Sequence, residues 1–444
     1  MEHDKDQDMS ENKNNSNKAQ DINPRFASEG CSVLLDVNDG DRLVFARLSG
    51  GAGLKIGNTR YSLKPLIGAP FGSLFQVESG SEEGSFLSRI LPIKKESTSN
   101  NVTEDTRDNR ELIDNNEAQN LTEEEIGAMR REGAKGDEII EALIANSKTF
   151  DKKFQLSQDK YKLKKQKKYA PKVLLRRPFA RSICEAYFKK YPARIGFLRV
   201  DALSLLLTMA NVTAYSDVLV VDMVGGLVTG AVAERLGGTG YVCNTYKGNT
   251  PSSVDMVRMF NFTDKVIERI VQSSIDELSS PKTASPERVC NSEININESS
   301  ASDKVEDVSV TVEARVVDDV VLLESKVIKS PKAGAKASKE AVEMWKENGF
   351  SSLIMAAQDQ DPWSLAKDVL PLLSYSAPFA IYHQYLQPLA TCMHNLQQGK
   401  MAINLQITEP WLREYQVLPS RTHPHMQMNS FGGYVLSGIR ISTT

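Results

Sequence analysis

The chain has 444 residues, of which 25% are charged and 40% hydrophobic, and its formal net charge is −3. This near-neutral charge excludes a protein that is polybasic over its whole length, and the length predicts two or three domains. No apolar run reaches the ~18 residues of a membrane span, and the polar N-terminus lacks the apolar core of a signal peptide. The five cysteines form no CxxC pair, which excludes a cysteine zinc site and favours a reducing compartment.

The N-terminal part is predicted to hold a polar tail followed by a small β domain. Residues 1–24 carry too few apolar side chains to fold alone, so we expect them to be disordered. Residues 25–95 contain the short apolar runs SVLLDV, RLVFARL, GLKIG and SLFQV, separated by glycines. Runs of this kind are typical of strands.

Residues 96–177 are predicted to form an acidic linker, helices and a basic segment. Ten acids lie between Glu96 and Glu125 against two arginines, a balance typical of a linker. Thr122 and Glu125 then have the spacing of a capping box, which begins a helix, and a second helix follows. The basic segment holds ten Lys and Arg residues and no acid: Lys160, Lys162, Lys164, Lys165, Lys167, Lys168, Lys172, Arg176, Arg177 and Arg181.

From residue 178 to residue 444 the pattern alternates between helix and strand, which predicts an α/β domain with a mostly parallel sheet. The composition of residues 273–337 is rich in Ser, Asn and Glu and predicts a disordered insertion, although valine runs near its end favour one more strand. No helical pattern separates the last two strands, AINLQITEPW and GYVLSGIRIS. This predicts an antiparallel edge on the parallel sheet.

The first strand–turn–helix of such a sheet is where a nucleotide-like ligand binds. Glycines are needed there because they adopt positive φ and let the backbone approach the ligand. A loop for S-adenosylmethionine would read acid-x-Gly-x-Gly-x-Gly. Here Asp222 is followed by Met223 and Leu227 at the first and third glycine positions. Only Gly225 is in register, and Gly226 falls on a variable position.

A second requirement is an acid at the end of the next strand, which would bind the ribose hydroxyls. That strand ends in residues 243–247, CNTYK, which include no acid, and Lys247 has the opposite charge. Two independent requirements therefore fail, and we expect no cofactor in this chain and a loop kept for packing. The alternatives are an S-adenosylmethionine-dependent RNA methyltransferase that acts alone, and a nicotinamide oxidoreductase, which the same absences disfavour equally.

Three long segments resemble one family in the right order. They are LTEEEIGAMRREG with GDEIIEALIANSKTFDKKFQLSQDKYKLKKQKKY, RPFARSICEAYFKKYPARIGFLRVDALSLLLTMANV with VVDMVGGLVTGAVAERLGGTG, and INLQITEPWLREYQVLPSRTHPHMQMNSFGGYVLSGIRI. The chain resembles the non-catalytic subunits of tRNA (adenine-58, N1) methyltransferase over roughly residues 25–272 and 338–444.

The resemblance implies a Rossmann-like methyltransferase sheet behind an N-terminal β-barrel-like domain. It implies a homologous catalytic partner, joined in a two-plus-two heterotetramer, that binds S-adenosylmethionine and methylates a T-loop adenine. It also implies that this subunit binds tRNA and that the complex is nuclear. The lack of an apolar span, noted above, predicts that the chain has no membrane partner.

The basic segment is the main candidate for RNA contact, because Lys and Arg neutralise phosphates. Tyr161 and Tyr169 lie among the lysines and could stack on bases. A solvated face or a nuclear import signal is the alternative. Arg413 and Arg421, in the final connection, are further candidates for RNA, a partner or a salt bridge.

Two other features favour structural roles. Asp359 and Asp361 follow a predicted strand, where active enzymes place an acid, but Asp361 before Pro362 is the pattern of a helix N-cap. The five histidines show no metal-ligand spacing with acids or cysteines, so we expect no metal site.

Overall fold

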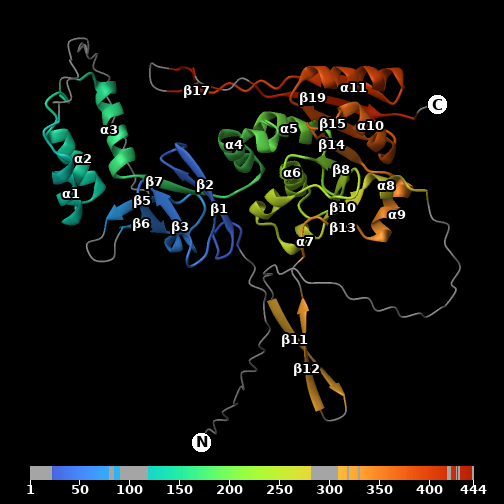
Figure 1. Cartoon of the computed structure of the whole chain (residues 1–444), viewed down its shortest axis with the longest axis horizontal. Coiled ribbons are helices and arrows are strands. Elements are labelled where there is room, and N and C mark those ends of the chain that lie inside the picture. Colours follow the sequence, from blue (N-terminus) through green and yellow to red (C-terminus); the bar gives the residue numbers. More distant parts are fainter. Residues whose placement is uncertain are drawn as a thin grey trace, which may run out of the picture. The chain divides into compact units, whose positions relative to one another are not determined.

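The structure is a computed structural model that describes residues 23–79, 85–90, 119–151, 153–281, 309–317, 320–328, 331–417, 422–426, 428 and 431–442. The chain divides into two compact units, which Figure 1 shows in the colours of the sequence. The N-terminal unit comprises Met1–Arg42 and Ala46–Arg176, and the C-terminal unit comprises Leu43–Phe45 and Arg177–Thr444. Nearly all of the predicted tail and most of the acidic linker lie outside the described residues.

The N-terminal unit contains a five-stranded sheet with the order β2-β1-β7-β5-β6, and β3 and β4 form a separate hairpin. The apolar runs predicted β1, β2, β3 and β5, whereas β4 and β6 were not predicted. However, the central strand β7 comes from the predicted basic segment and pairs antiparallel with both β1 and β5. Its alternate residues Val173 and Leu175 are fully buried. The bounds are β1 Ser32–Val37, β2 Arg42–Arg47, β3 Gly53–Ile56, β4 Thr59–Ser62, η1 Lys64–Leu66, β5 Leu74–Ser79, β6 Ser85–Ile90 and β7 Lys172–Arg176.

Three helices precede β7: α1 Glu123–Arg131, α2 Gly136–Ala145 and α3 Gln155–Tyr169. The predicted capping box of α1 is confirmed, because the Thr122 hydroxyl accepts from the Glu125 N–H at 3.3 Å and the Glu125 carboxylate accepts from the Thr122 N–H at 2.8 Å. Ile126, Ile139 and Leu143 form a small buried cluster between α1 and α2. The third helix was not predicted, and it carries six of the ten basic residues.

The C-terminal unit is built on an eight-stranded sheet with the order β13-β10-β9-β8-β14-β15-β19-β16. The predicted mostly parallel α/β sheet is confirmed. The strand that runs against the others is β19, and it lies between β15 and β16, so the edge strand β16 runs parallel to the rest. The bounds are β8 Asp217–Asp222, β9 Tyr241–Tyr246, β10 Ile270–Ser274, β13 Ala335–Lys336, β14 Ser352–Ala356, β15 Pro378–His383, β16 Ala402–Thr408 and β19 Tyr434–Arg440.

Helices cover both faces of this sheet. The strands contribute side chains to both cores, because successive side chains of a strand point to opposite faces. In β8, Val218 and Val220 belong to the core beneath α4–α6, whereas Leu219 and Val221 belong to the core beneath α8–α11. Figure 1 shows the two groups of helices on either side of the strands. The bounds are α4 Ala180–Lys190, η2 Pro192–Ile195, α5 Val200–Met209, α6 Leu227–Leu236, η3 Asp255–Phe260, α7 Asp264–Ile267, α8 Ile275–Ser279, α9 Lys339–Asn348, α10 Pro362–Val369, η4 Leu370–Leu372 and α11 Leu386–Gln398.

The segment predicted as an insertion, residues 273–337, has ordered ends. It begins inside β10 and continues through α8, and it ends at β13, which pairs with β10. Within it, β11 (Ser309–Val317) and β12 (Val320–Ile328) form an antiparallel hairpin in the region of the valine runs. Near the C-terminus, β17 (Tyr415–Gln416) and β18 (His423–Pro424) form another short antiparallel pair. No helix among the described residues is long and apolar enough to cross a membrane.

Candidate functional site

The loop after β8 is organised by one buried carboxylate. Asp222 is fully buried, and its Oδ1 accepts hydrogen bonds from the N–H groups of Val224 at 2.9 Å and Gly226 at 3.1 Å. Its Oδ2 accepts from the N–H of Thr229 at 2.8 Å and from the Thr229 hydroxyl at 2.9 Å. Burial raises the pKa of Asp222, and these hydrogen bonds oppose the rise. Both carboxylate oxygens therefore bind the loop and α6 and have no need of a ligand.

The two glycines of the loop pack against another segment of the same unit, the one around Val254 and Met256. Gly225 and Gly226 have φ of 76° and 88°, the left-handed region that favours glycine. A β-carbon added at Gly226 would lie 2.6 Å from the Cα of Val254. The Met256 N–H also donates to the Gly225 carbonyl at 3.0 Å. The close approach that these glycines permit is made by the segment that leads into η3.

We placed the glycine positions of the loop one residue too early. Counted from Asp222, the pattern acid-x-Gly-x-Gly-x-Gly has its glycines at Val224, Gly226 and Val228, so Gly226 is the glycine in register. Val224 and Val228 are fully buried in the core beneath α4–α6.

The two residues that we had assigned to the missing glycine positions also belong to the core. Leu227 is fully buried among the side chains beneath α4–α6. Met223 is partly buried against the opposite core, and its N–H donates to the Ala356 carbonyl of β14 at 3.0 Å. These side chains are thus part of the packing of the fold.

The end of β9 lacks the chemistry of a ribose site. Asn244 is fully buried, and its Oδ1 accepts from the Asp222 N–H at 3.2 Å. Lys247, just after the strand, donates to Asp368 at 2.9 Å. An amide that holds the neighbouring strand and a lysine in an ion pair stand where a carboxylate would bind ribose hydroxyls. Together with the loop, these residues do not fit S-adenosylmethionine.

The acids after β14 have the geometry predicted for structural residues. Asp361 accepts from the Ser364 N–H at 2.9 Å, and Pro362 is the first residue of α10, so the predicted N-cap is confirmed. Asp359 is exposed. Among the described residues, no group of three His, Cys, Asp or Glu side chains could hold a metal ion.

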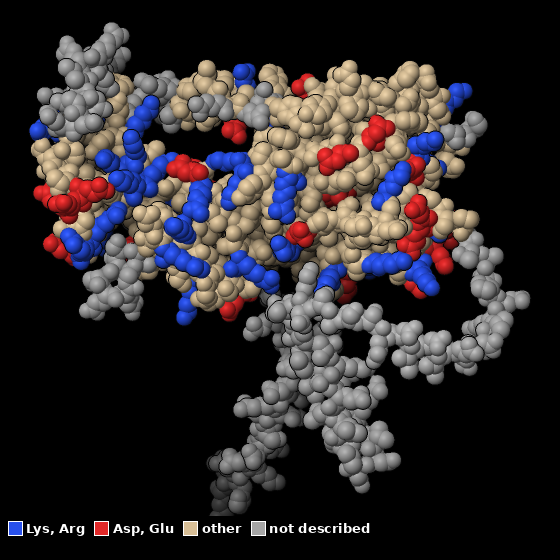
Figure 2. All heavy atoms as spheres, in the orientation of Figure 1, with Lys and Arg blue, Asp and Glu red and all other residues tan. Residues whose placement is uncertain are grey.

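The basic segment divides between the two units. Lysine and arginine side chains gather over α3 in Figure 2. Lys160, Lys162, Lys164 and Lys168 of this helix are exposed. Lys167 instead makes a 2.7 Å ion pair with Asp41 of the same unit.

Lys165 has a different environment from the exposed lysines of α3. Its Nζ lies 5.2 Å from the ring centre of Tyr161 and 5.9 Å from that of Tyr169. Burial lowers the pKa of Lys165, and the nearby Lys168 and Lys164 lower it further.

The two tyrosines of α3 already have cations on their rings. Tyr161 packs edge-on against Phe150 at 5.6 Å, and Lys153 lies 5.0 Å from its ring centre. Tyr169 packs against the α1–α2 cluster, with Arg130 at 5.3 Å from its ring centre. The hypothesis that these tyrosines stack on bases gains no support from this geometry.

The other predicted RNA-binding residues are scattered. Lys172 and Arg176 lie on β7, where Arg176 pairs with Asp36 at 3.3 Å. Arg181 pairs with Glu185 along α4 at 2.7 Å. The remaining candidates are Arg177, which is exposed, Arg413, whose guanidinium lies 5.7 Å from the ring centre of Trp411, and Arg421, which lies outside the described residues.

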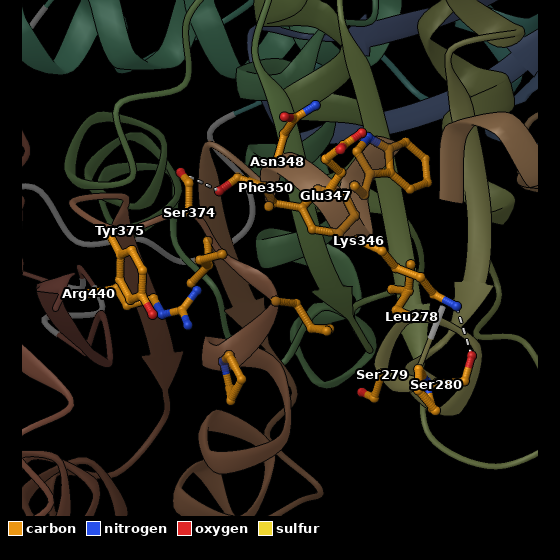
Figure 3. A pocket seen from close by; sticks show the side chains of 16 residues that line it. Leu278, Ser279, Ser280, Lys346, Glu347, Asn348, Phe350, Ser374, Tyr375 and Arg440 are labelled. Atoms are coloured by element: carbon orange, nitrogen blue, oxygen red, sulfur yellow. Dashed lines mark hydrogen bonds between the residues drawn. The ribbon is translucent and has the colours of Figure 1, made fainter. Parts of the chain in front are cut away.

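A cavity of 660 Å³ opens at the other end of the sheet from the loop, and Figure 3 shows it from close by. It is lined by the end of α9, by residues 371–375 before β15, and by Arg440 at the end of the antiparallel β19. These positions all lie at the amino ends of the parallel strands. Arg440 packs on Tyr375, with its guanidinium 4.8 Å from the ring centre. The cavity is therefore remote from the edge where such sheets bind nucleotides.

Comparison with known proteins gives a consistent family. Residues 27–305 match the Gcd10p family. A Dictyostelium discoideum protein named tRNA (adenine(58)-N(1))-methyltransferase non-catalytic subunit trm6 is 33% identical over 437 residues, which cover 93% of this chain and 79% of the relative. The Mus musculus protein of the same name is 31% identical, with coverage of 86% and 82%. The crystal structure of tRNA (m1A58) methyltransferase TrmI from Aquifex aeolicus aligns with 94% of this chain and 100% of its own at 12% identity and a TM-score of 0.43.

Proposed function

Because this chain belongs to the Gcd10p family, we propose that it is the non-catalytic, tRNA-binding subunit of the methyltransferase that forms N1-methyladenosine at adenine 58 of the tRNA T-loop. A homologous catalytic subunit is its partner, in a two-plus-two heterotetramer. That partner binds S-adenosylmethionine, and this chain binds none. The complex works in the nucleus, and the basic segment is also a candidate import signal.

The observation that carries the proposal is the internal use of the degenerate loop. Both carboxylate oxygens of Asp222 accept hydrogen bonds from the loop and α6, and Gly226 packs closely against Val254. The residues at this edge therefore serve the fold and offer no methyl donor site. Relatives at 31% and 33% identity carry the name of a non-catalytic subunit, which agrees with this reading.

A subunit without chemistry is useful because the substrate is large and anionic. An enzyme that acts on a base within folded tRNA must expose that base and hold the rest of the molecule. A second subunit of the same fold widens the binding surface, and its lysines add electrostatic affinity. The exposed lysines of α3 are the best-placed group for this role in the N-terminal unit.

Reconstitution tests the proposal. The chain and its catalytic partner are purified together, and methylation of a tRNA transcript is measured with each subunit omitted in turn. We expect full activity only with both present, and a mass of the complex equal to two copies of each. Methylation by this chain alone would instead support the alternative of an independent enzyme.

A further inference from the structure

The end of α4 carries an exposed tyrosine among cations. Tyr191 follows the helix directly and is 55% exposed. The Lys190 ammonium lies 5.1 Å from the Tyr191 ring centre, and both side chains are on the surface. The ring centre of Tyr187, one turn earlier, lies 6.5 Å from that of Tyr191, and Tyr187 is buried. The ring of Tyr191 therefore packs against a buried neighbour on one side.

Arg194, in the short helix η2, completes the cluster. Its side chain is 50% exposed, and its guanidinium lies 5.7 Å from the ring centre of Tyr187. Among the described residues, Asp255 forms an ion pair with this guanidinium at 3.9 Å, and Asp255 is itself 58% exposed. An ion pair of this length between two exposed side chains is weak, so most of the positive charge of Arg194 is available to a ligand.

The cluster is fixed at the edge of the sheet where ligands bind. Gly196, which ends η2, accepts a hydrogen bond from the Tyr382 hydroxyl at 3.0 Å, and Tyr382 lies near the carboxyl end of β15. Doubly wound sheets bind their ligands outside the carboxyl ends of the strands. Lys190, Tyr191 and Arg194 therefore lie beside that edge, within the C-terminal unit.

Tyr191 differs from the tyrosines of α3 in how much of its side chain is accessible to solvent. Tyr161 and Tyr169 are each enclosed by two or more cations and by neighbouring apolar groups. Tyr191 has more than half of its surface open. An aromatic ring of this kind stacks on a nucleobase without regard to its identity, and flanking cations bind the phosphates on either side.

We propose that Lys190, Tyr191 and Arg194 form a second RNA contact, in which Tyr191 stacks on an unpaired base of the tRNA and the two cations bind adjacent phosphates. This inference rests on the proposed function, because it takes tRNA as the ligand. It assigns base contact to the C-terminal unit and leaves the lysines of α3 to bind the backbone.

The test is the affinity of the full-length chain for a fluorescent tRNA transcript, measured by anisotropy at several salt concentrations. Tyr191→Ala should weaken binding by about five- to hundredfold with an unchanged salt slope, because stacking carries no charge. Tyr191→Phe keeps the ring and should bind within about twofold of wild type. Lys190→Ala and Arg194→Ala should each lower the salt slope by about 0.7–0.9.

Tyr375→Ala is the matched control. Tyr375 is also exposed and also carries a cation on its ring, Arg440 (Figure 3). However, Tyr375 comes just before β15 and so lies at the amino ends of the parallel strands. This variant should bind tRNA as wild type does.

Three results would overturn the proposal. They are wild-type affinity for Tyr191→Ala, an equal loss for Tyr375→Ala, and a Tyr191→Ala defect that appears only in assembly with the catalytic partner. If Tyr191→Ala binds tRNA normally while the reconstituted complex still needs this chain, the second contact is refuted and the proposed function stands. If the wild-type chain binds no tRNA, both fail together.

Discussion

Thr229 makes two hydrogen bonds to one oxygen of Asp222, from its N–H at 2.8 Å and from its hydroxyl at 2.9 Å. Asp222 ends β8 and Thr229 lies in the first turn of α6, so this pair ties the helix to the strand across the loop. The carboxylate thereby holds the loop in place without any ligand.

Removal of this carboxylate should destabilise the chain. Asp222→Ala leaves the buried donors of Val224, Gly226 and Thr229 without an acceptor, and we expect the free energy of unfolding to fall by about 2–4 kcal/mol. Thr229→Val, which removes only the hydroxyl, should cost about 1 kcal/mol. Urea titrations followed by circular dichroism measure both. A loss below about 0.5 kcal/mol for Asp222→Ala would contradict the structural role of this residue.

The same residue predicts a pH dependence. Burial raises the folded-state pKa of Asp222 above its ordinary value of about 3.9, so the folded state binds this proton more tightly than the unfolded state. Its contribution to stability is therefore fully present below the ordinary pKa and falls as pH rises through the raised pKa. Since Asp222→Asn cannot titrate, the stability of wild type relative to this variant should decrease with rising pH. A relative stability that increases with pH would contradict the sign of the shift.

Gly226→Ala should destabilise more than a glycine replacement without a neighbour. The new methyl group meets the Val254 backbone at 2.6 Å and also forces a φ of 88° on an alanine. We expect a loss of about 2–4 kcal/mol. Gly237→Ala is the control, because Gly237 has a φ of 64° with no atom within 4 Å of the added carbon, and it should cost only about 1 kcal/mol. Equal changes in Tm for the two variants would contradict the close packing of Val254 against Gly226.

The exposed lysines of α3 should account for part of the salt dependence of tRNA binding. Replacement of Lys160, Lys164 and Lys168 by alanine should lower the slope of log affinity against log salt by about 2–3, because each phosphate contact contributes about 0.7–0.9. Lys167→Ala is the control, since Lys167 is paired with Asp41. A slope that the triple variant leaves unchanged would remove α3 from the RNA surface.

Cysteine reactivity should follow burial. Cys184, Cys243 and Cys392 are fully buried, and burial raises the pKa of each thiol, to about 12 for Cys392. These thiols stay protonated and should resist alkylation in the folded chain at about pH 8, whereas the half-exposed Cys31 should react. Mass spectrometry after iodoacetamide treatment measures this. Labelling of Cys392 as fast as Cys31 would contradict the packing of α11.

Local patterns predicted local structure well. The Thr122–Glu125 capping box and the Asp361–Pro362 helix start depend on neighbouring residues, and both are confirmed. The lack of two of the three loop glycines is also a local feature of the sequence, although the register that we assigned was one residue too early.

Long-range packing could not be predicted from the sequence. The strand β7 lies in the middle of the N-terminal sheet because of pairings with residues more than ninety positions earlier, such as Leu34 with Arg176. The place of β19 inside the sheet is likewise a matter of tertiary pairing. Which lysines of α3 face aromatic rings depends on how the helix packs on α2. Tyr191 was not singled out from the sequence, because its exposure depends on how α4 and η2 fold.

The central claim is that this edge of the sheet has no site for S-adenosylmethionine. Isothermal titration of the purified chain with S-adenosylmethionine tests it most directly, with the catalytic partner as the positive control. We predict no heat of binding for this chain and saturable binding for the partner. Saturable micromolar binding by this chain alone, lost in Gly226→Ala, would contradict the claim.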